Sequence, residues 1–412
     1  MFRRILACAL TAGLIATSLG TGAVSAQQDW PQWRGPNRDG SAASFAPPAE
    51  WPEQLTRRWK VEVGLGYATP LVVGNRIYMF SRQGGDEVMS ALDPATGAVL
   101  WKTGYPTSFT MNSGAARHGA GPKSTPVFSN GRLFAIGMTG NVTAFDAATG
   151  KQVWHKPGSP VVPTFTTHAF SPLVERGLVI FHVGGHNQGA ITAFDVNTGD
   201  EKWSWKGDGP GYGSPIIADL DGTRQIIALT QGKLVGLDAA NGSLLWERPF
   251  VSANFTNSAT PVLAGHTVIV SNGGPATAVT LTKRDNKWTT ENAWENPEVP
   301  FRLSNAVLSG DMLVGFSTRN SGQYFGVDVA TGKTLWTSEG RQGGNAALAR
   351  TGDLLFSLED DGELIVARSS RTAFAPLRRY TVADSPTWTQ AAFSGDRIFV
   401  KDETTLALWT LK

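Results

Sequence analysis

Apolar residues recur along this chain as pairs of short strand-like runs joined by a turn. Five pairs begin with Ser or Thr before Pro, continue into an apolar run, reverse at a Gly-containing turn and return along a second apolar run. Three later pairs follow the same plan without the proline. Such runs, bounded by Gly, Asn and Asp, are typical of β-hairpins. The eight pairs begin near residues 68, 124, 170, 213, 259, 304, 345 and 389.

A second pattern follows most of these pairs: an Asp, a Gly four positions later, and a Trp four positions after that. Successive Asp residues are 53, 49, 43 and 90 positions apart, and the last gap corresponds to two units of about 45. A repeat of roughly 40–50 residues is the signature of a β-propeller. The five copies are Asp93, Gly97 and Trp101; Asp146, Gly150 and Trp154; Asp195, Gly199 and Trp203; Asp238, Gly242 and Trp246; and Asp328, Gly332 and Trp336.

Each residue type in this repeat has a structural role to fill. An Asp carboxylate accepts hydrogen bonds from backbone N–H groups two or three residues on, which makes an Asx-type turn. A Gly provides the positive φ that a tight reversal needs. A Trp is large enough to fill the wedge between neighbouring blades. We therefore interpret all fifteen residues as structural.

Counting the hairpins predicts an all-β, eight-bladed propeller of four-stranded antiparallel blades, with seven blades as the alternative. The fifth and seventh units lack the repeat. The candidate wedge residue is Trp288 or Trp294 in the fifth unit and Tyr380 in the seventh. The last unit ends at Lys412 after three strands. Residues 57–63, with Trp59 in the wedge position, predict an N-terminal strand that closes this last blade and removes two exposed sheet edges.

The N-terminus divides into two segments before the propeller. Residues 1–26 have a positive start, an apolar run and a small-residue site before Gln27, which is the pattern of a cleavable signal peptide. We therefore expect cleavage near Ala26 and a periplasmic or secreted protein. A lipoprotein at Cys8, the single cysteine, is a weaker alternative. Residues 27–55 predict an irregular Trp- and Pro-rich segment, and residues 56–412 the propeller.

Composition agrees with this fold and narrows the function. The 412 residues include 47 Gly and 14 Trp, which suits a turn-rich β-protein. A formal net charge of +2 gives no basis for nucleic-acid binding. No segment after the signal peptide is apolar enough to cross a bilayer. The pattern identifies neither an oligomer nor a partner, and we expect a monomer.

The Asp–Gly–Trp repeat resembles the tryptophan-docking repeat of the pyrroloquinoline quinone (PQQ) β-propeller superfamily, and residues 29–38 (DWPQWRGPNR) are similar to the N-terminal signature of its secreted members. This superfamily includes PQQ-dependent alcohol dehydrogenases and the non-enzymatic outer-membrane assembly factor BamB. The resemblance implies a non-catalytic binding or scaffold protein of the BamB class. The alternative that it implies is a PQQ-dependent dehydrogenase of alcohols or sugars, with Ca²⁺ beside the quinone.

Acidic residues are sparse in the loops that lead to each inner strand, where such an enzyme would hold Ca²⁺ and a carboxylate base. The candidates are scattered, one or two to a loop: Asp208, Glu295, Glu298, Glu339 and Asp384. No catalytic residue, metal site or firm cofactor is therefore predicted, and PQQ with Ca²⁺ stays open. His182 and His186, four apart on a strand-like run, would be separated by ~13 Å and lack a third ligand.

One residue per blade, three or four positions before each hairpin, forms a predicted ring at the channel mouth. All eight are aromatic, cationic or amide residues: Tyr67, Lys123, His168, Tyr212, Asn257, Arg302, Asn345 and Trp388. His118 and Arg341 lie in nearby loops. Cationic side chains bind carboxylates and aromatic rings stack on planar groups. The ring therefore suggests a small anionic or planar ligand, with an envelope protein as the other candidate partner and plain polar lining as the alternative.

Overall fold

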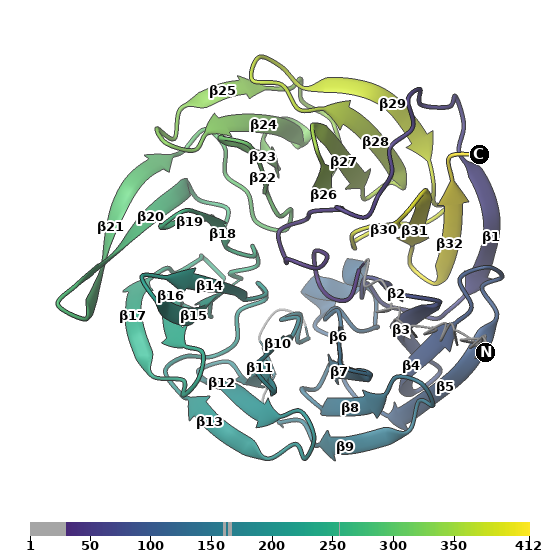
Figure 1. Cartoon of the computed structure of the whole chain (residues 1–412), viewed down its shortest axis with the longest axis horizontal. Coiled ribbons are helices and arrows are strands. Elements are labelled where there is room, and N and C mark those ends of the chain that lie inside the picture. The colour runs from purple at the N-terminus through teal and green to yellow at the C-terminus, as the bar shows by residue number, and fades with distance from the viewer. Residues whose placement is uncertain (1–29, 160–161, 164–166, 255) are drawn as a thin grey trace, which may run out of the picture.

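The chain forms a disc of eight antiparallel sheets around a central channel (Figure 1). The computed structural model describes residues 30–159, 162–163, 167–254 and 256–412. Each sheet has four strands, so the predicted eight-bladed propeller is confirmed. The predicted signal peptide and Cys8 lie outside the described residues.

The first seven blades each use four consecutive strands. Blade 1 contains β2 (Leu71–Val73), β3 (Arg76–Gln83), β4 (Asp86–Leu92) and β5 (Val99–Pro106), and blade 2 contains β6 (Val127–Ser129), β7 (Arg132–Ile136), β8 (Val142–Asp146) and β9 (Gln152–Lys156). Blade 3 contains β10 (Leu173–Glu175), β11 (Leu178–Gly185), β12 (Gln188–Asp195) and β13 (Glu201–Trp205), and blade 4 contains β14 (Ile216–Leu220), β15 (Thr223–Leu229), β16 (Lys233–Asp238) and β17 (Leu244–Pro249). Blades 5 to 7 contain β18 (Val262–Ala264), β19 (Thr267–Val270), β20 (Ala276–Arg284), β21 (Lys287–Asn296); β22 (Val307–Ser309), β23 (Met312–Ser317), β24 (Gln323–Asp328), β25 (Thr334–Thr337); and β26 (Ala346–Thr351), β27 (Leu354–Glu359), β28 (Glu363–Arg368), β29 (Ala375–Thr381).

Blade 8 joins the two ends of the chain. It contains β30 (Ala392–Ser394), β31 (Arg397–Lys401), β32 (Thr405–Thr410) and, as its outer strand, β1 (Thr56–Glu62). Thr56 pairs with Thr410 and Glu62 with Thr405, with a register shift between Arg57 and Trp59. The predicted closure by residues 57–63 is therefore confirmed, and every blade has its four strands.

Five Trp residues on outer strands lie on the repeat Gly of the next blade. A Cβ atom added to Gly150 would come within 2.4 Å of the Trp101 ring. The Trp101 indole N–H also donates to the carbonyl of Ala147 at 3.2 Å. Trp59, Trp154, Trp203 and Trp294 lie in the same way on Gly97, Gly199, Gly242 and Gly332. These contacts join neighbouring blades, because each Trp and the Gly that it contacts belong to successive blades.

The Asp of the repeat fixes the turn that presents this Gly. The Asp146 carboxylate accepts hydrogen bonds from the Thr149 backbone N–H at 2.8 Å and from its hydroxyl at 2.7 Å. These bonds lower the pKa of Asp146, the hydroxyl contributing most. Gly150 then takes a φ of 75°, which an L side chain rarely adopts.

Blades without the repeat use other anchors. In blade 5, Trp294 supplies the wedge, and its indole N–H donates to the carbonyl of Val329 at 2.8 Å. Blade 5 has no repeat Gly to receive Trp246, so that indole bonds instead to Gln225 of its own blade at 2.8 Å. Tyr380 of blade 7 donates its hydroxyl to the carbonyl of Pro52 at 2.7 Å, which ties the irregular N-terminal segment to the sheet.

We expect Gly150→Ala to destabilise the protein more than Gly131→Ala. Both glycines have φ near 75° (75° and 77°), so each substitution carries the left-handed backbone strain of about 1–2 kcal/mol. Nothing lies within 4 Å of an added Cβ at Gly131, whereas Trp101 fills that space at Gly150. Overpacking adds roughly 1–3 kcal/mol to the second substitution. Chemical denaturation of both variants measures the difference, and equal losses would show that the Trp–Gly contact is not tight.

The Ser and Thr residues before the inner strands form a series of hydrogen bonds between blades. The Thr69 N–H donates to the Thr125 hydroxyl at 3.0 Å, and the Thr125 N–H donates to the Ser171 hydroxyl at 2.9 Å. The Ser171 N–H continues to Ser214 at 3.0 Å. At the other end, the hydroxyl groups of Thr69 and Thr389 lie 2.7 Å apart, so these bonds link blades 8, 1, 2, 3 and 4. The Ser/Thr-Pro pattern therefore holds the inner edges of the blades together.

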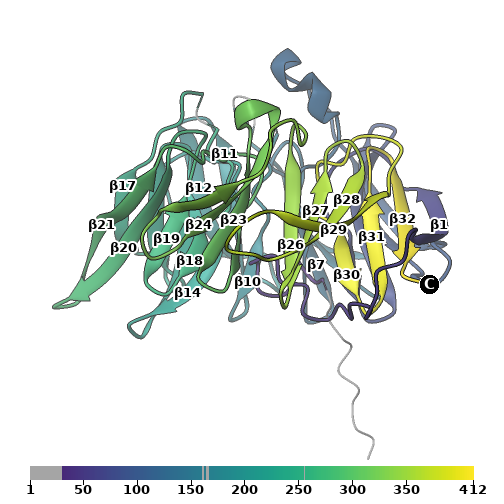
Figure 2. The same ribbon diagram turned by 90° about the horizontal axis from the view of Figure 1, so that it is seen from above.

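Residues 30–46, named the clasp here, cross the lower face of the disc and contact all eight blades (Figures 1 and 2). Their backbone pairs with the inner strands of four blades, through Trp30 and Val72, Pro31 and Phe128, Ala42 and Arg350, and Ala46 and Gly395. Side chains reach the other four. The Trp33 indole N–H donates to the Thr260 hydroxyl of blade 5 at 2.9 Å.

Two buried arginines complete the clasp. Arg38 donates to the carbonyls of Ser171 and Pro172 in blade 3 at 2.9 and 2.8 Å, and to that of Pro215 in blade 4 at 2.8 Å. Arg34 donates to the carbonyl of Ala306 in blade 6 at 2.7 Å. Burial lowers the pKa of Arg34 to about 10 and that of Arg38 to about 9. Arg38 is therefore bound mainly by neutral carbonyl groups at the start of inner strands. Arg34 donates to the carbonyls of Arg38 and Asp39 within the clasp as well as to that of Ala306.

Candidate functional site

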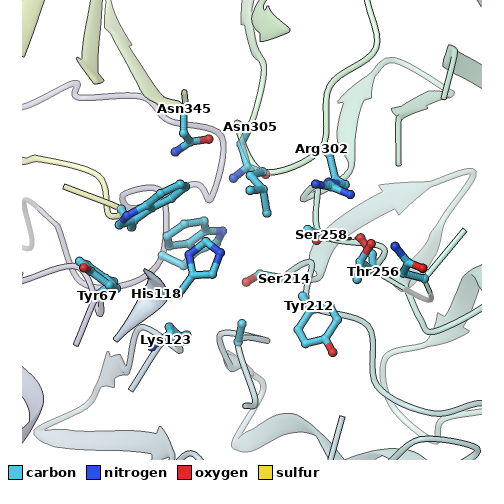
Figure 3. Close-up of a pocket in the computed structure, with 15 residues that line it drawn as sticks. Tyr67, His118, Lys123, Tyr212, Ser214, Thr256, Ser258, Arg302, Asn305 and Asn345 are labelled. Atoms are coloured by element: carbon cyan, nitrogen blue, oxygen red, sulfur yellow. Dashed lines mark hydrogen bonds between the residues drawn. The ribbon is translucent and has the colours of Figure 1, made fainter. Parts of the chain in front are cut away.

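A cavity of about 250 Å³ opens at the channel on the face opposite the clasp (Figure 3). The loop between β5 and β6 rises above this upper face, and it carries the short 3₁₀ helix η1 (Ser113–His118) (Figure 2). Every blade contributes to the lining. The lining residues are Trp33, Tyr67, His118, Lys123, Ala169, Tyr212, Ser214, Asn254, Thr256, Ser258, Arg302, Leu303, Asn305, Asn345 and Trp388.

Six of the eight residues of the predicted ring line this cavity: Tyr67, Lys123, Tyr212, Arg302, Asn345 and Trp388. The other two side chains, His168 and Asn257, are buried outside it. Ala169 stands beside the first of these positions, and Thr256 and Ser258 flank the second. An error of one residue in aligning each of these two loops is enough to replace the true lining residue by its neighbour.

His168 and Asn257 are held by neighbouring blades. His168 packs on Gly140, whose added Cβ would lie 2.9 Å from the ring nitrogen. Burial, together with the nearby His182, lowers the pKa of His168 to about 3, so the ring is neutral. The Asn257 amide donates to the carbonyls of Phe250 at 2.6 Å and Thr230 at 2.9 Å. Both residues therefore stabilise the scaffold around the cavity.

Lys123 is positioned by a glycine-rich loop that packs closely on blade 1. A Cβ at Gly121 would lie 2.3 Å from the Leu65 backbone, so only Gly fits there. The Lys123 amine donates to the carbonyls of Gly119 at 2.8 Å and Gly121 at 2.7 Å. It also lies 5.5 Å from the centre of the Tyr67 ring. Burial, with repulsion from Lys401, lowers the pKa of Lys123 to about 7.

Arg302 supplies the second cationic group of the lining. It follows Phe301, which is buried and anchored by its N–H to the Ser271 hydroxyl at 3.1 Å. Among the described residues, no hydrogen bond or ion pair involves the Arg302 guanidinium. Lys123 and Arg302 stand on different sides of the cavity (Figure 3). A ligand between them would meet a positive group at both ends.

Aromatic rings form much of the remaining wall. His118, from the 3₁₀ helix, meets Trp388 edge to face with ring centres 4.6 Å apart. Trp33 reaches the cavity from the clasp, so the N-terminal segment is part of the site. Burial raises the pKa of Tyr67 to about 12, with smaller contributions from Glu403 and Asp402, so its hydroxyl stays protonated. Planar groups stack favourably on such rings.

No Asp or Glu is among the described residues that line the cavity. The loop acids considered from the sequence lie elsewhere, and three have partners: Asp208 accepts from the Thr230 hydroxyl at 2.6 Å, Asp384 pairs with Lys60 at 2.7 Å, and Glu295 accepts from Asn292 at 2.7 Å. Glu298 and Glu339 are exposed. Sequence reasoning missed the buried Glu359, which accepts from the Tyr324 hydroxyl at 2.7 Å and whose pKa burial raises to about 7. Glu359 also stands outside the lining.

The histidine pair is separated by its local structure. His182 is buried on β11, with its ring nitrogen 3.3 Å from the Asp208 carbonyl, and His186 lies in the following turn. Within the described ranges, no three His, Cys, Asp or Glu side chains are grouped so that they could hold a metal ion. The same part of the chain contains no helix long and apolar enough to span a membrane.

A family model described as outer membrane protein assembly factor BamB matches residues 84–338 and 258–409. The chain belongs to this family. It is 28% identical over 295 residues to BamB from Burkholderia pseudomallei, and the match covers 68% of each chain. The structure of BamB from Moraxella catarrhalis superposes with a TM-score of 0.60 at 17% identity, covering 86% of this chain and 99% of that one. This likeness supports the same propeller fold.

Quinoprotein enzymes are also similar, over shorter stretches. A quinohemoprotein alcohol dehydrogenase from Comamonas testosteroni is 30% identical over 141 residues, which are 34% of this chain and 19% of that enzyme. The structure of the quinohemoprotein alcohol dehydrogenase ADHIIG from Pseudomonas putida superposes with a TM-score of 0.62 at 14% identity, covering 93% of this chain and 80% of that one. The fold of this chain is therefore also found in a class of enzymes.

The cavity residues do not fit a Ca²⁺-bound quinone. Ca²⁺ takes six to eight oxygen ligands, among which carboxylates supply the negative charge. This lining offers amide and hydroxyl oxygens together with Lys123 and Arg302, which repel a cation. A carboxylate to remove a hydroxyl proton from an alcohol is also missing from the described lining. The same residues do suit the negative charge of a planar acid without its metal.

Proposed function

We propose that this protein is an exported, non-catalytic binding propeller of the BamB class whose upper cavity holds a small planar anion. One observation supports this ligand class: a cavity walled by aromatic rings contains two cationic side chains and no carboxylate among its described residues. The positive ends bind acidic groups and the rings stack on the planar body. Export follows from the signal peptide predicted over residues 1–26.

An envelope protein is the proposed second partner. The match to BamB, an outer membrane protein assembly factor, supports this class of partner. The outer strands of the blades offer edges to which a peptide could add as a further strand. These edges lie on the rim of the disc (Figure 1). The cavity is lined by loops at the channel, so both partners can bind at once.

The second candidate function is a PQQ-dependent dehydrogenase of alcohols or sugars. The similarity to quinohemoprotein alcohol dehydrogenases favours it. The lining opposes it, because neither a calcium site nor a carboxylate base is found there. PQQ can test both functions, because it is the cofactor of the enzyme and is also a planar acid.

Titration with PQQ separates the two functions. We expect PQQ to quench the tryptophan fluorescence of the purified protein at a ratio of one to one in the presence of EDTA. Added Ca²⁺ should leave the affinity within about twofold, and no dye should be reduced with alcohols or sugars. Binding that requires Ca²⁺, together with dye reduction, would establish the dehydrogenase. Absence of binding under both conditions would remove the proposed ligand class.

A further inference from the structure

Lys123 has surroundings that are unusual for a lysine at a binding cavity. Its amine donates hydrogen bonds to the carbonyls of Gly119 and Gly121 and forms no ion pair with any described residue. A second lysine, Lys401, is fully buried nearby and donates to the carbonyls of Asp402 at 2.7 Å and Glu403 at 2.9 Å. Two amines thus share one poorly solvated region at the meeting of blades 1, 2 and 8.

The surroundings of this pair let Lys123 exchange between its cationic and neutral forms near neutral pH. Burial and the charge of Lys401 lower the pKa of Lys123 to about 7. Lys401 keeps a higher pKa, about 8, because Asp402, Glu62 and Glu403 partly offset its own burial. His118 and Tyr67 are the other titratable groups facing the cavity near Lys123, and burial raises the pKa of Tyr67 to about 12, which leaves it uncharged at neutral pH. A lysine beside a second cation is a recognised arrangement for an activated amine nucleophile.

Hydrogen-bond geometry agrees with the neutral amine. A neutral amine has two N–H donors and one lone pair, whereas the ammonium group has three donors and no lone pair. The carbonyls of Gly119 and Gly121 use two donors. In the neutral form this leaves the lone pair of Lys123, which lines the cavity, for a bound ligand.

From this cluster we propose that Lys123 captures a planar aromatic aldehyde with an anionic group as an imine, the anion being held by Arg302 across the cavity. This inference rests on the proposed function, because it uses the same cavity, and it adds the carbonyl group to the ligand class. The amine nitrogen attacks the carbonyl carbon, and a C=N bond replaces the C=O bond. The oxygen leaves as water with both amine hydrogens, so nothing is oxidised or reduced.

Pyridoxal 5′-phosphate is a suitable probe, since it combines a planar ring, an aldehyde and a phosphate. The full protein is incubated with it at a series of pH values, reduced with borohydride and mapped by peptide mass spectrometry. We expect Lys123 to be labelled at a probe concentration at least ten times lower than exposed Lys151 or Lys333. Its labelling should rise with pH around a midpoint near 7, following the lowered pKa.

Lys123→Arg is the matched variant, because it keeps the charge and the hydrogen-bond donors but cannot form an imine. It should lose the selective label at position 123. Pyridoxine 5′-phosphate, which has an alcohol in place of the aldehyde, should leave Lys123 of the unmodified protein unlabelled under the same reduction. Should this variant fail to fold, the site of labelling in the unmodified protein still decides the matter. Labelling of Lys123 that is no stronger than that of the exposed lysines would overturn the inference.

The two proposals fail in distinguishable ways. If pyridoxine 5′-phosphate and PQQ both bind but Lys123 is not selectively labelled, the cavity binds planar anions and the imine inference is wrong. If neither of these two compounds binds and Lys123 is still selectively labelled, the lysine is reactive and the planar-anion function is wrong. If binding and labelling are both absent, both proposals are overturned.

Discussion

Replacing Arg38 with Ala is expected to lower the free energy of unfolding by roughly 3 kcal/mol or more. The side chain is buried and donates hydrogen bonds to the carbonyls of Ser171, Pro172 and Pro215 and to the Gln32 side chain. A hydrogen bond to a charged group contributes about 1.5–3 kcal/mol, and each buried acceptor left unpaired carries a further penalty. Removing the guanidinium also removes the cost of burying it. The net loss of stability is therefore smaller than the sum of the lost hydrogen-bond contributions.

Equilibrium denaturation in urea measures this loss. Arg58→Ala is the matched control, because Arg58 is exposed on β1 and its side chain forms no hydrogen bond or ion pair with any described residue. It should change the stability by less than about 0.5 kcal/mol. An Arg38→Ala protein as stable as the control would mean that the clasp does not hold blades 3 and 4 together. Because these acceptors lie at the start of inner strands, we also expect the urea unfolding transition of Arg38→Ala to be less cooperative.

The second large effect is expected at the cavity, where Arg302→Met should weaken the binding of PQQ in EDTA by about 10–100-fold. The guanidinium has no hydrogen bond or ion pair with any described residue, so a ligand carboxylate would be its partner. Losing a charge-assisted hydrogen bond of about 1.5–3 kcal/mol gives a loss of this size. Because Arg302 supports no other contact of this kind, the thermal stability should change little.

Arg319→Met serves as the control for charge alone. Arg319 lies in the exposed 3₁₀ turn η2 (Arg319–Ser321) and is absent from the cavity lining. The same fluorescence titration should give an unchanged affinity for this variant at moderate ionic strength. Equal weakening by both substitutions would show that the anion is attracted by the general charge of the protein and that Arg302 does not contact it.

The architecture could be predicted from the sequence because its signals are local and periodic. The Asp–Gly–Trp repeat places a turn, a positive φ and a wedge in every copy, and the pairing of Trp59 with the last blade followed from an incomplete set of strands. Trp294 could be separated from Trp288 only by the structure, since both follow an apolar run at similar spacing. The direction of docking, from each Trp to the next Gly, was also invisible in a single repeat.

The clasp shows where sequence reasoning stopped. Its composition predicted an irregular segment, but the roles of Arg34 and Arg38 depend on carbonyls more than 130 positions away in several cases. Hydrogen bonds to backbone acceptors leave no pattern in the partner sequence. A signal was present, however: two arginines lie in a Gly- and Pro-containing segment whose sequence has one acid, Asp39. The lining residues Thr256 and Ser258 were missed because an irregular loop has no periodicity to fix its register.

The pairing of β1 with β32 has a consequence for the order in which the molecule can form. Thr56 leaves the ribosome long before Thr410, yet they meet in one sheet. The two residues are 354 positions apart along the chain, and such distant contacts slow folding. Partly synthesised chains therefore keep an open ring with unpaired strand edges until β32 has been made and can pair with β1.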